Sequence, residues 1–396
     1  MTVTGSVDVA GARGYVHQAF LYDTPTELID ALVMFVDEGR EADENVLVVI
    51  SKEKGAMLLE RLGSSAGFQL LDSVDVYTSP AKTLAAYIAT VRDGTSEGRA
   101  MRVAGEPIWE GLSAIEIAEW ACVESACNVA FASSRLTMFC PYDTSVLDPA
   151  IIAAATQTHP ELRSGGHTVT SNQYSDPHQF HSMVRATDIP VPHDAYEECS
   201  IASSDELWRI ALFAEAFGEL HALSPKLTSD LLGGVREVAK TALASNAGPI
   251  TLRLWIEPNE IFSDIIGPWR TVPLAGYIQH PSEEHGSPGL WSVGQICDLI
   301  AVREQGDITT VRLKFSSNTE RVNPTCEEYA EFLGVYAIGA CNPSESVMIE
   351  GHLAECSSCR EEVGMFGGVV ALMREARDSD APWPSMRDPD DDASTP

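Results

Sequence analysis

The sequence predicts a chain of several domains: an N-terminal α/β block with a mostly parallel sheet, a central α+β sandwich and a small helical C-terminal module. Up to about residue 160, short apolar segments alternate with amphipathic helical segments, which is typical of parallel α/β sheets. Two long helical patterns then precede paired strands, which favours an α+β arrangement. Near the C-terminus, a histidine and two cysteines have the spacing of metal ligands on a helix.

The N-terminal block is expected to form five strands with helices between them. The candidate strands are 17–22, 46–50, 74–77, 101–105 and 136–140. After the first strand, Thr24-Pro25-Thr26-Glu27 supplies a capping box with proline at the first helical position. No G-x-x-x-x-G-K-[ST] loop occurs, so a phosphate cradle of that type is absent from the sequence. Residues 161–198 are rich in Gly, Ser, Pro and His without clear periodicity, which indicates a linker or an extended hairpin.

The central block begins with helices and ends with strands. Its expected helices are 205–223, 229–245 and 290–300, and its expected strands are 250–256, 261–266, 301–303 and 309–315. The predicted domain boundaries are 14–165 for the first block, 166–198 for a linker, 199–318 for the second block, 324–376 for the C-terminal module and 377–396 for a disordered acidic tail.

The C-terminal module contains the most specific pattern of the chain. His352, Cys356 and Cys359 form H-x-x-x-C-x-x-C, in which residues four apart share a helix face. Tetrahedral zinc needs a fourth ligand. Cys326 is the preferred candidate because it opens a helical stretch, whereas Cys341 lies in a loop. The sequence therefore predicts zinc as a cofactor; a reduced cysteine pair is the alternative.

Charge and cysteine usage limit the possible partners. The formal net charge is −32, which disfavours direct binding to DNA or RNA and favours basic protein surfaces. Nine scattered cysteines and a polar N-terminus without a signal-peptide core indicate a reducing, cytoplasmic location. The apolar stretches are too short to span a membrane.

The C-terminal module resembles the zinc-binding anti-sigma domain over about 50 residues. The resemblance lies in Cys326-Glu-Glu-Tyr-Ala-Glu-Phe-Leu-Gly-Val-Tyr336 and in Gly351-His-Leu-Ala-Glu-Cys-Ser-Ser-Cys-Arg-Glu-Glu-Val363. It implies a helical module that binds a sigma factor and keeps it from RNA polymerase. Some family members release zinc when their thiols are oxidised, and spacing does not decide whether this one does.

The N-terminal block resembles the MEDS sensory domain. The matching pieces are His17-Gln-Ala-Phe-Leu-Tyr22, Gly105-Glu-Pro-Ile-Trp109, Glu124-Ser-Ala-Cys-Asn128, Cys140-Pro-Tyr-Asp143, Leu147-Asp-Pro149 and Thr158-His-Pro160. The resemblance implies a sensor of small molecules on a RecA- or KaiC-like core. Ligands of parallel sheets lie beyond the carboxyl ends of the strands, which predicts a sensory pocket lined by His17, Tyr22, Glu106, Trp109, Tyr142 and Asp143. The alternative is that the aromatic residues and His17 belong to the core.

The central block resembles the GHKL ATP-binding domain of anti-sigma kinases. The strongest piece is Gly286-Ser-Pro-Gly289-Leu-Trp291. The resemblance implies that nucleotide contacts fall on Asp264, Gly286, Gly289 and Leu290, with Glu237 as the catalytic group if the site is active.

The catalytic positions depart from that family. Thr241 occupies the place of the magnesium-binding asparagine, and Ile266 occupies the tight-turn position of the first glycine box. Threonine has no amide carbonyl for a hard cation. We therefore expect a degenerate pseudokinase without ATP or magnesium, with a working serine/threonine kinase as the alternative.

Together the three blocks predict a cytosolic, signal-responsive regulator of transcription that sequesters a sigma factor or an anti-sigma antagonist. The trailing helix carries Val363, Phe366, Val370 and Met373 at helical spacing, which either pack within the zinc module or contact the partner. The competing interpretations are an ATP-dependent kinase and a zinc/thiol redox switch in which Cys356 and Cys359 form a disulfide and expel zinc.

Overall fold

The structure is a computed structural model of the chain. It describes residues 14–95, 98–190, 196–244, 248–272, 274–278 and 289–316, with single residues Leu333, Tyr336, Ile349, Leu353, Cys356, Cys359, Arg360 and Val363. The contacts divide the chain into one compact unit that ends at Ser317 and a second that begins at Asn318.

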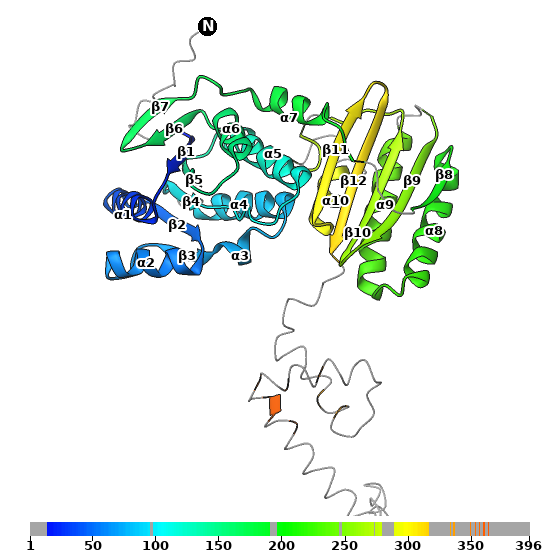
Figure 1. The fold of residues 1–396 in the computed structure, drawn as a ribbon, viewed down its shortest axis with the longest axis horizontal. Coiled ribbons are helices and arrows are strands. Elements are labelled where there is room, and N and C mark those ends of the chain that lie inside the picture. The colour runs from blue at the N-terminus through cyan, green and yellow to red at the C-terminus, as the bar shows by residue number, and fades with distance from the viewer. Residues whose placement is uncertain are drawn as a thin grey trace, which may run out of the picture. The chain divides into compact units, whose positions relative to one another are not determined.

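The first sheet has seven strands in the order β3-β2-β4-β5-β1-β6-β7 (Figure 1). Its strands are β1 Val16–Tyr22, β2 Asn45–Ile50, β3 Gln69–Asp72, β4 Met101–Gly105, β5 Leu136–Asp143, β6 Glu161–Ser164 and β7 His167–Thr170. All neighbours pair in parallel except β6 and β7, which form an antiparallel hairpin at the edge. The expected parallel sheet is therefore confirmed, with a mixed edge.

Helices on both faces cover this sheet. They are α1 Pro25–Glu41, α2 Lys52–Leu62, α3 Ser73–Val76, α4 Pro80–Gly94, α5 Ala114–Ala130, α6 Pro149–Thr158 and α7 Pro177–Arg185. At the start of α1, the side chain of Thr24 accepts a hydrogen bond from the Glu27 amide, and proline occupies the first turn. The predicted threonine cap and proline are therefore confirmed, whereas the Glu27 carboxylate accepts from the Asp23 amide at 3.3 Å and not from the Thr24 amide that a capping box requires.

Two segments differ from the expectation. The predicted strand 74–77 is wrong, because Asp72 caps the Val74 amide at 3.2 Å and starts the short helix α3; the strand in this region is Gln69–Asp72. In the segment 161–198, the β6–β7 hairpin agrees with the hairpin alternative, whereas helix α7, which packs on α5, was not expected. Apolar alternation around Val74 looks like a strand but is overridden by the local cap.

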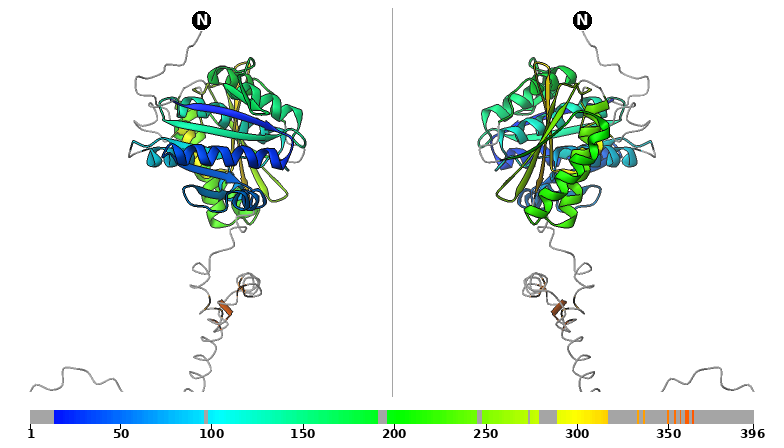
Figure 2. Two further views of the ribbon diagram at one scale, coloured as in Figure 1. Left: turned by 90° about the vertical axis from the view of Figure 1, so that its left-hand side faces the viewer. Right: turned by 90° about the vertical axis from the view of Figure 1, so that its right-hand side faces the viewer.

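The second sheet has five antiparallel strands in the order β11-β12-β10-β9-β8. The strands are β8 Glu197–Ile201, β9 Ile250–Glu257, β10 Glu260–Gly267, β11 Leu299–Gln305 and β12 Ile308–Ser316. The helices are α8 Leu207–Leu220, α9 Pro225–Ala244 and α10 Gly289–Ile296, after the 3-10 turn η1 Ser204–Glu206. Buried residues of α8 and α9 share a core with one face of the sheet, including Leu231, Leu252 and Ile265 (Figure 2, right).

Helix α5 lies between the two sheets. Its residues Glu119 to Cys127 are all buried, and the helix contacts both the first block and β11. Lys314 of β12 pairs with Glu116, and Arg303 of β11 pairs with Glu119. Since alternate side chains of a strand point to opposite faces, the second sheet holds α8 and α9 on one face and α5 on the other.

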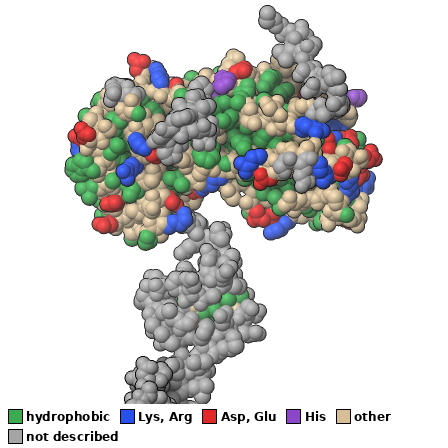
Figure 3. Space-filling model, turned by 180° about the vertical axis from the view of Figure 1, so that it is seen from behind, with side chains coloured by type: hydrophobic (Ala, Val, Ile, Leu, Met, Phe, Trp, Pro, Cys, Tyr) green, Lys and Arg blue, Asp and Glu red, His purple; other side chains and the backbone are tan. Residues whose placement is uncertain are grey.

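Charged side chains of both signs are interspersed on the visible face in Figure 3. The negative charge of the chain is therefore not gathered into one patch on this face. Within the part of the chain that the structure describes, no helix is both long and apolar enough to cross a bilayer.

In the second unit, Leu333, Ile349 and Cys359 are buried together, with Cys356 packed against them. Of the predicted zinc ligands, Cys326 and His352 lie outside the described residues, as do Phe366, Val370 and Met373.

Candidate functional site

Tyr22 and Glu106, two residues of the predicted sensory pocket, meet at the carboxyl edge of the first sheet. The Tyr22 hydroxyl donates a hydrogen bond to Glu106 Oε1 at 2.5 Å. Lys54, in the first turn of α2, donates to Glu106 Oε2 at 2.7 Å and to the Tyr22 oxygen at 2.9 Å. Burial raises the pKa of Tyr22 far above its ordinary value, and the negative charge of Glu106 is the second cause. This hydroxyl therefore keeps its proton and stays a donor.

The sequence interpretation missed Lys54, although it follows β2 by four residues at the same sheet edge. Its ammonium group balances the carboxylate of Glu106, with side-chain exposures of 24% and 12%. A ligand at this place would therefore meet a triad of hydroxyl, ammonium and carboxylate groups whose net charge is zero. It would not meet an uncompensated negative charge. This environment suits a polar ligand that exchanges hydrogen bonds with the triad.

Of the other predicted pocket residues, Trp109 and Tyr142 are buried, with ring centroids 5.9 Å apart, whereas Asp143 is partly exposed. Among the described residues, the Trp109 indole N–H has no hydrogen-bond partner. Asp143 accepts hydrogen bonds from the amide and hydroxyl of Ser145 at 3.0 and 2.6 Å. Tyr142 in turn contacts the ring of His159 edge-on at 5.6 Å, which leads from the predicted pocket to a buried polar cluster.

That cluster consists of His17, Glu124, Cys140 and His159, all buried, with one potential ligand atom from each within 4.8 Å of the others. Three of its residues lie on β1, α5 and β5, and His159 directly follows α6. β1 and β5 are parallel neighbours in which Ala19 pairs with Cys140. Strand alternation therefore places His17 and Cys140 on the sheet face that α5 covers, where Glu124 projects from the helix.

Three side chains of the cluster approach the same carboxylate oxygen. Glu124 Oε2 lies 3.3 Å from His17 Nε2, 3.5 Å from His159 Nε2 and 3.6 Å from Cys140 Sγ. The Cys140 sulfur is also 3.6 Å from His17 Nε2. The rings of the two histidines are 4.1 Å apart.

Neighbouring groups define which ring nitrogens carry hydrogen. Asn128 donates its amide hydrogens to backbone carbonyls, including that of Thr158 at 2.8 Å, so its Oδ1 accepts from His17 Nδ1 at 3.1 Å. His159 Nδ1 lies 2.9 Å from the Ala155 carbonyl, to which it donates. In neutral rings the Nε2 atoms then carry lone pairs, and both face Glu124. His159 Nε2 is buried without a hydrogen-bond partner.

Burial governs the protonation of the cluster. It lowers the pKa of His17 to about 4, and His159 adds to that effect. Burial alone would raise the pKa of Glu124, but the neighbouring imidazoles of His159 and His17 outweigh it and hold that pKa well below the usual range. Burial also raises the pKa of the Cys140 thiol. An ionised Glu124 carboxylate thus faces the Nε2 atoms of His17 and His159, at 3.3 and 3.5 Å.

Sequence reasoning nominated only His17 from this cluster. Glu124, Cys140 and His159 stood in the matching pieces of the sensory-domain resemblance, but no role was assigned to them. What could have identified them is a polar side chain among otherwise apolar neighbours. That these positions lie close together depends on the strand order of the sheet.

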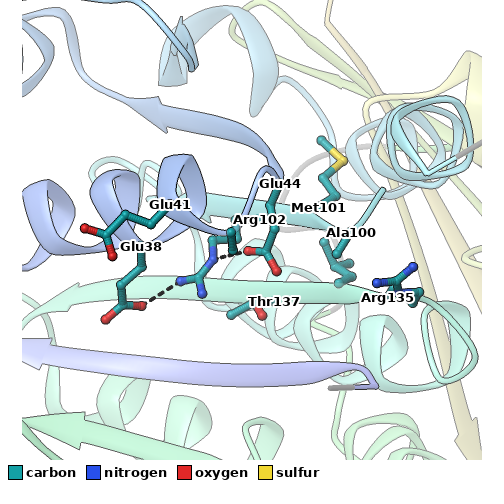
Figure 4. Close-up of a pocket in the computed structure, with 10 residues that line it drawn as sticks. Glu38, Glu41, Glu44, Ala100, Met101, Arg102, Arg135 and Thr137 are labelled. Atoms are coloured by element: carbon teal, nitrogen blue, oxygen red, sulfur yellow. Dashed lines mark hydrogen bonds and ion pairs between the residues drawn. The ribbon is translucent and has the colours of Figure 1, made fainter. Parts of the chain in front are cut away.

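A hollow of about 640 Å³ lies at the opposite, amino end of the first sheet. Figure 4 shows Arg102 at its centre, held by Glu38 and Glu44. Arg102 is thus already paired with acidic side chains, and Arg135, which also lines the hollow, donates to the Gly98 carbonyl. None of the predicted site residues lies there.

The nominated nucleotide-site residues of the central block have protein partners. The Asp264 carboxylate forms two hydrogen bonds with Arg312, at 2.7 and 2.6 Å, on the sheet face opposite α9. Glu237 Oε1 accepts from the Gly289 amide at 3.3 Å, and Thr241 donates to the Glu237 carbonyl at 2.9 Å. Leu290 is buried in the core of this lobe, while Gly286 lies outside the described residues.

Comparison with protein families identifies two parts of the chain. Residues 16–160 match the family described as "MEthanogen/methylotroph, DcmR Sensory domain", MEDS. Residues 326–360 match a family described as "Putative zinc-finger", a module that is typical of anti-sigma factors. The chain therefore carries a sensory domain and a zinc-finger module, whereas the GHKL interpretation of the central block stays a prediction. Among curated proteins, none matches this sequence.

Proposed function

We propose that the chain is a cytosolic, signal-responsive regulator of the anti-sigma type, which sequesters a sigma factor or an anti-sigma antagonist through its zinc module. The observation that carries this proposal is the presence of a MEDS sensory domain and a zinc-finger module on one chain. A sensory domain needs a means of passing its signal to a partner, and the zinc finger supplies a binding surface for this output.

The sensing end of this proposal is the triad of Tyr22, Lys54 and Glu106. It lies at the carboxyl edge of the parallel sheet, where such folds bind their ligands. A small polar molecule that accepts from Lys54 or Tyr22 would compete with the Glu106 carboxylate for these donors. Its binding energy would then favour a different arrangement of β4 and α2.

Helix α5 supports transmission between the first two blocks. It contacts the first sheet on one side, while Glu119 on its other side forms a buried ion pair with Arg303 of β11 at 2.6 Å. Glu116 pairs with Lys314 of β12 in the same interface. Displacement of α5 would therefore act directly on the second sheet, because these charges must move together or lose their partners.

The output end is the zinc module. Its donor set, Cys326, His352, Cys356 and Cys359, has the composition of closed structural zinc sites. When bound, zinc would fix the helices that carry these ligands, and thereby the surface offered to a partner. The strongly acidic chain would speed association with the basic, nucleic-acid-facing surface of a sigma factor.

The central block serves as a protein scaffold in this proposal. Arg312 occupies both carboxylate oxygens of Asp264, and the Thr241 hydroxyl is bonded to its own helix. Both side chains are engaged by groups of the protein itself, which supports a domain without magnesium–ATP chemistry over the kinase alternative.

A capture experiment tests the function. The full chain, immobilised and incubated with purified sigma factors and anti-sigma antagonists of its source cell, is expected to retain one of them. The variant Cys356→Ser/Cys359→Ser should lose this binding, because the zinc site loses two ligands. Cys199→Ser, a half-buried cysteine on β8, is the matched control and should retain it. Equal retention of the partner by all three proteins would overturn the proposal, as would retention by none.

A further inference from the structure

We propose that His17, Glu124, Cys140 and His159 bind a divalent transition-metal ion of the zinc type, in a second metal centre between the first sheet and α5. This centre is distinct from the zinc module, to which residues 326–360 belong. It does not depend on the proposed function, since it rests on the positions of four side chains.

Four of the six separations between the ligand atoms match a tetrahedral site, and all six lie within 4.8 Å. Zinc bonds of about 2.0–2.3 Å to nitrogen, oxygen and sulfur place neighbouring tetrahedral ligands about 3.3–3.7 Å apart. The separations from Glu124 Oε2 to the two histidine nitrogens are 3.3 and 3.5 Å. The sulfur of Cys140 lies 3.6 Å from both Glu124 Oε2 and His17 Nε2. An ion at the centre of these atoms would reach them without rearrangement of the backbone.

The residues around the cluster hold the imidazoles in the orientation that a metal requires. Ligating histidines commonly donate their second ring N–H to a carbonyl or an amide oxygen, which fixes the tautomer. His17 donates to Asn128 Oδ1 at 3.1 Å, and His159 donates to the Ala155 carbonyl at 2.9 Å. Both Nε2 lone pairs are thereby directed at the same point.

An ion pair without metal explains the geometry less well. A protonated His159 would donate to Glu124 in a short, charge-assisted hydrogen bond of about 2.7–2.9 Å. Instead, His159 Nε2 lies 3.5 Å from the carboxylate and has no hydrogen-bond partner among the described residues. A buried polar atom without a partner destabilises the fold, whereas coordination of a cation would satisfy it.

The charges of the proposed site cancel. Two neutral imidazoles, the Glu124 carboxylate and the Cys140 thiolate bring two negative charges against a divalent cation. On binding, the thiol proton of Cys140 is released to solvent and a sulfur–metal bond takes its place. Nitrogen and sulfur donors favour zinc-like ions over magnesium or calcium, which prefer oxygen ligands. With four protein ligands and no open position, the centre would be structural and would clamp β1 and β5 to α5 and α6.

Metal analysis of the full chain tests this inference. In the Cys356→Ser/Cys359→Ser background, which disables the zinc module, we expect about one bound zinc ion per folded chain. No bound metal in this folded protein would overturn the proposal. If that background does not fold, the unmodified chain decides instead: two ions per chain support the second centre, and one or none contradicts it.

Cobalt substitution identifies the sulfur ligand. In the same background, the cobalt-loaded protein should show a thiolate-to-metal charge-transfer band and tetrahedral d–d bands. Adding Cys140→Ala should abolish the charge-transfer band and weaken metal binding at least about tenfold. Cys127→Ala is the matched control. Like Cys140, Cys127 is a buried cysteine, but it lies on α5 and outside the four-residue cluster. A charge-transfer band that survives Cys140→Ala, or disappears equally in Cys127→Ala, would contradict the assignment.

Discussion

Two buried glutamates of the same helix differ in how their charge is balanced. Glu119 meets Arg303 at 2.6 Å, with both side chains 3% exposed, and also accepts from the Tyr277 hydroxyl. Glu124, five residues later, faces two imidazole nitrogens and a thiol at 3.3–3.6 Å and no lysine or arginine among its contacts in the described residues. One carboxylate is fully paired within the protein; the other is surrounded by potential ligands.

This difference separates a structural contact from a site. A buried charge is stable only when it is paired and hydrogen-bonded. The Glu119–Arg303 pair meets that condition and joins the two sheets. The Glu124 cluster would meet it on binding a cation. The function of α5 would then be to connect a metal centre in the sensory domain with the interface to the second sheet.

The largest expected effect on stability comes from breaking the ion pair between Glu119 and Arg303. Glu119→Ala should lower the free energy of unfolding by about 3–5 kcal/mol, because Arg303 is left buried without its partner. Urea denaturation measures this change. Arg61→Ala is the control, since its pair with Asp30 is 3.0 Å long but 63% and 52% exposed; it should change stability by less than about 1 kcal/mol. Similar losses in the two variants would remove the distinction between interface and surface pairs.

Metal binding should have the next largest effect. In the Cys356→Ser/Cys359→Ser background, zinc at about a thousand times its dissociation constant should stabilise the fold by about 4 kcal/mol. Thermal unfolding with and without a chelator measures this. The stabilisation should vanish when Cys140→Ala is added. An unchanged melting temperature after chelation would indicate that no ion bound at the Glu124 cluster stabilises the fold.

A third prediction concerns pH at the interface. Burial lowers the pKa of His181 to about 3, while a hydrogen bond to the Cys122 carbonyl opposes the shift. The unfolded chain binds a proton at this histidine below about pH 6.5 and the folded chain does not. Its contribution to stability is therefore complete above pH 6.5 and is lost as the pH falls towards 3, by about 2 kcal/mol at pH 5.

Unfolding of wild type and His181→Gln at pH 7 and pH 5 measures this contribution. The variant should lose about 2 kcal/mol less than wild type over this interval, because glutamine does not titrate. Equal losses would show that His181 is protonated in the folded state, and that the contact with Tyr277 does not exclude water.

The smallest expected effect is at the triad. Tyr22→Phe removes one hydrogen bond to Glu106 and keeps the ion pair with Lys54, so it should cost about 1 kcal/mol of stability. If the triad senses the signal, the same variant should weaken the response in a reporter assay for the regulated promoter. A Glu106→Ala chain that keeps its full response would exclude this carboxylate from sensing.

The sequence predicts the elements of the fold better than their assembly. Strands such as Val46–Ile50 are apolar throughout, as expected for strands buried on both faces, and they were located to within a residue. The strand around Val74 was misplaced because a side-chain cap at Asp72 decides the local conformation. That choice depends on one hydrogen bond and is not visible in apolar alternation.

Within the triad, the sequence predicts the two residues that lie at strand ends. Tyr22 and Glu106 were found from their positions at strand ends, whereas Lys54 reaches them from the following helix. The cluster requires His17 and Cys140, 123 residues apart, to occupy neighbouring strands. That neighbourhood follows from the order β4-β5-β1, which periodicity within each segment does not contain.

The most direct test of the account is a crystal structure of the chain with anomalous difference maps collected on both sides of the zinc absorption edge. The account predicts a peak within about 2.0–2.3 Å of His17 Nε2, His159 Nε2, Glu124 Oε2 and Cys140 Sγ. A peak at Cys356 and Cys359 with none beside Glu124 would contradict the second metal centre while leaving the zinc module intact.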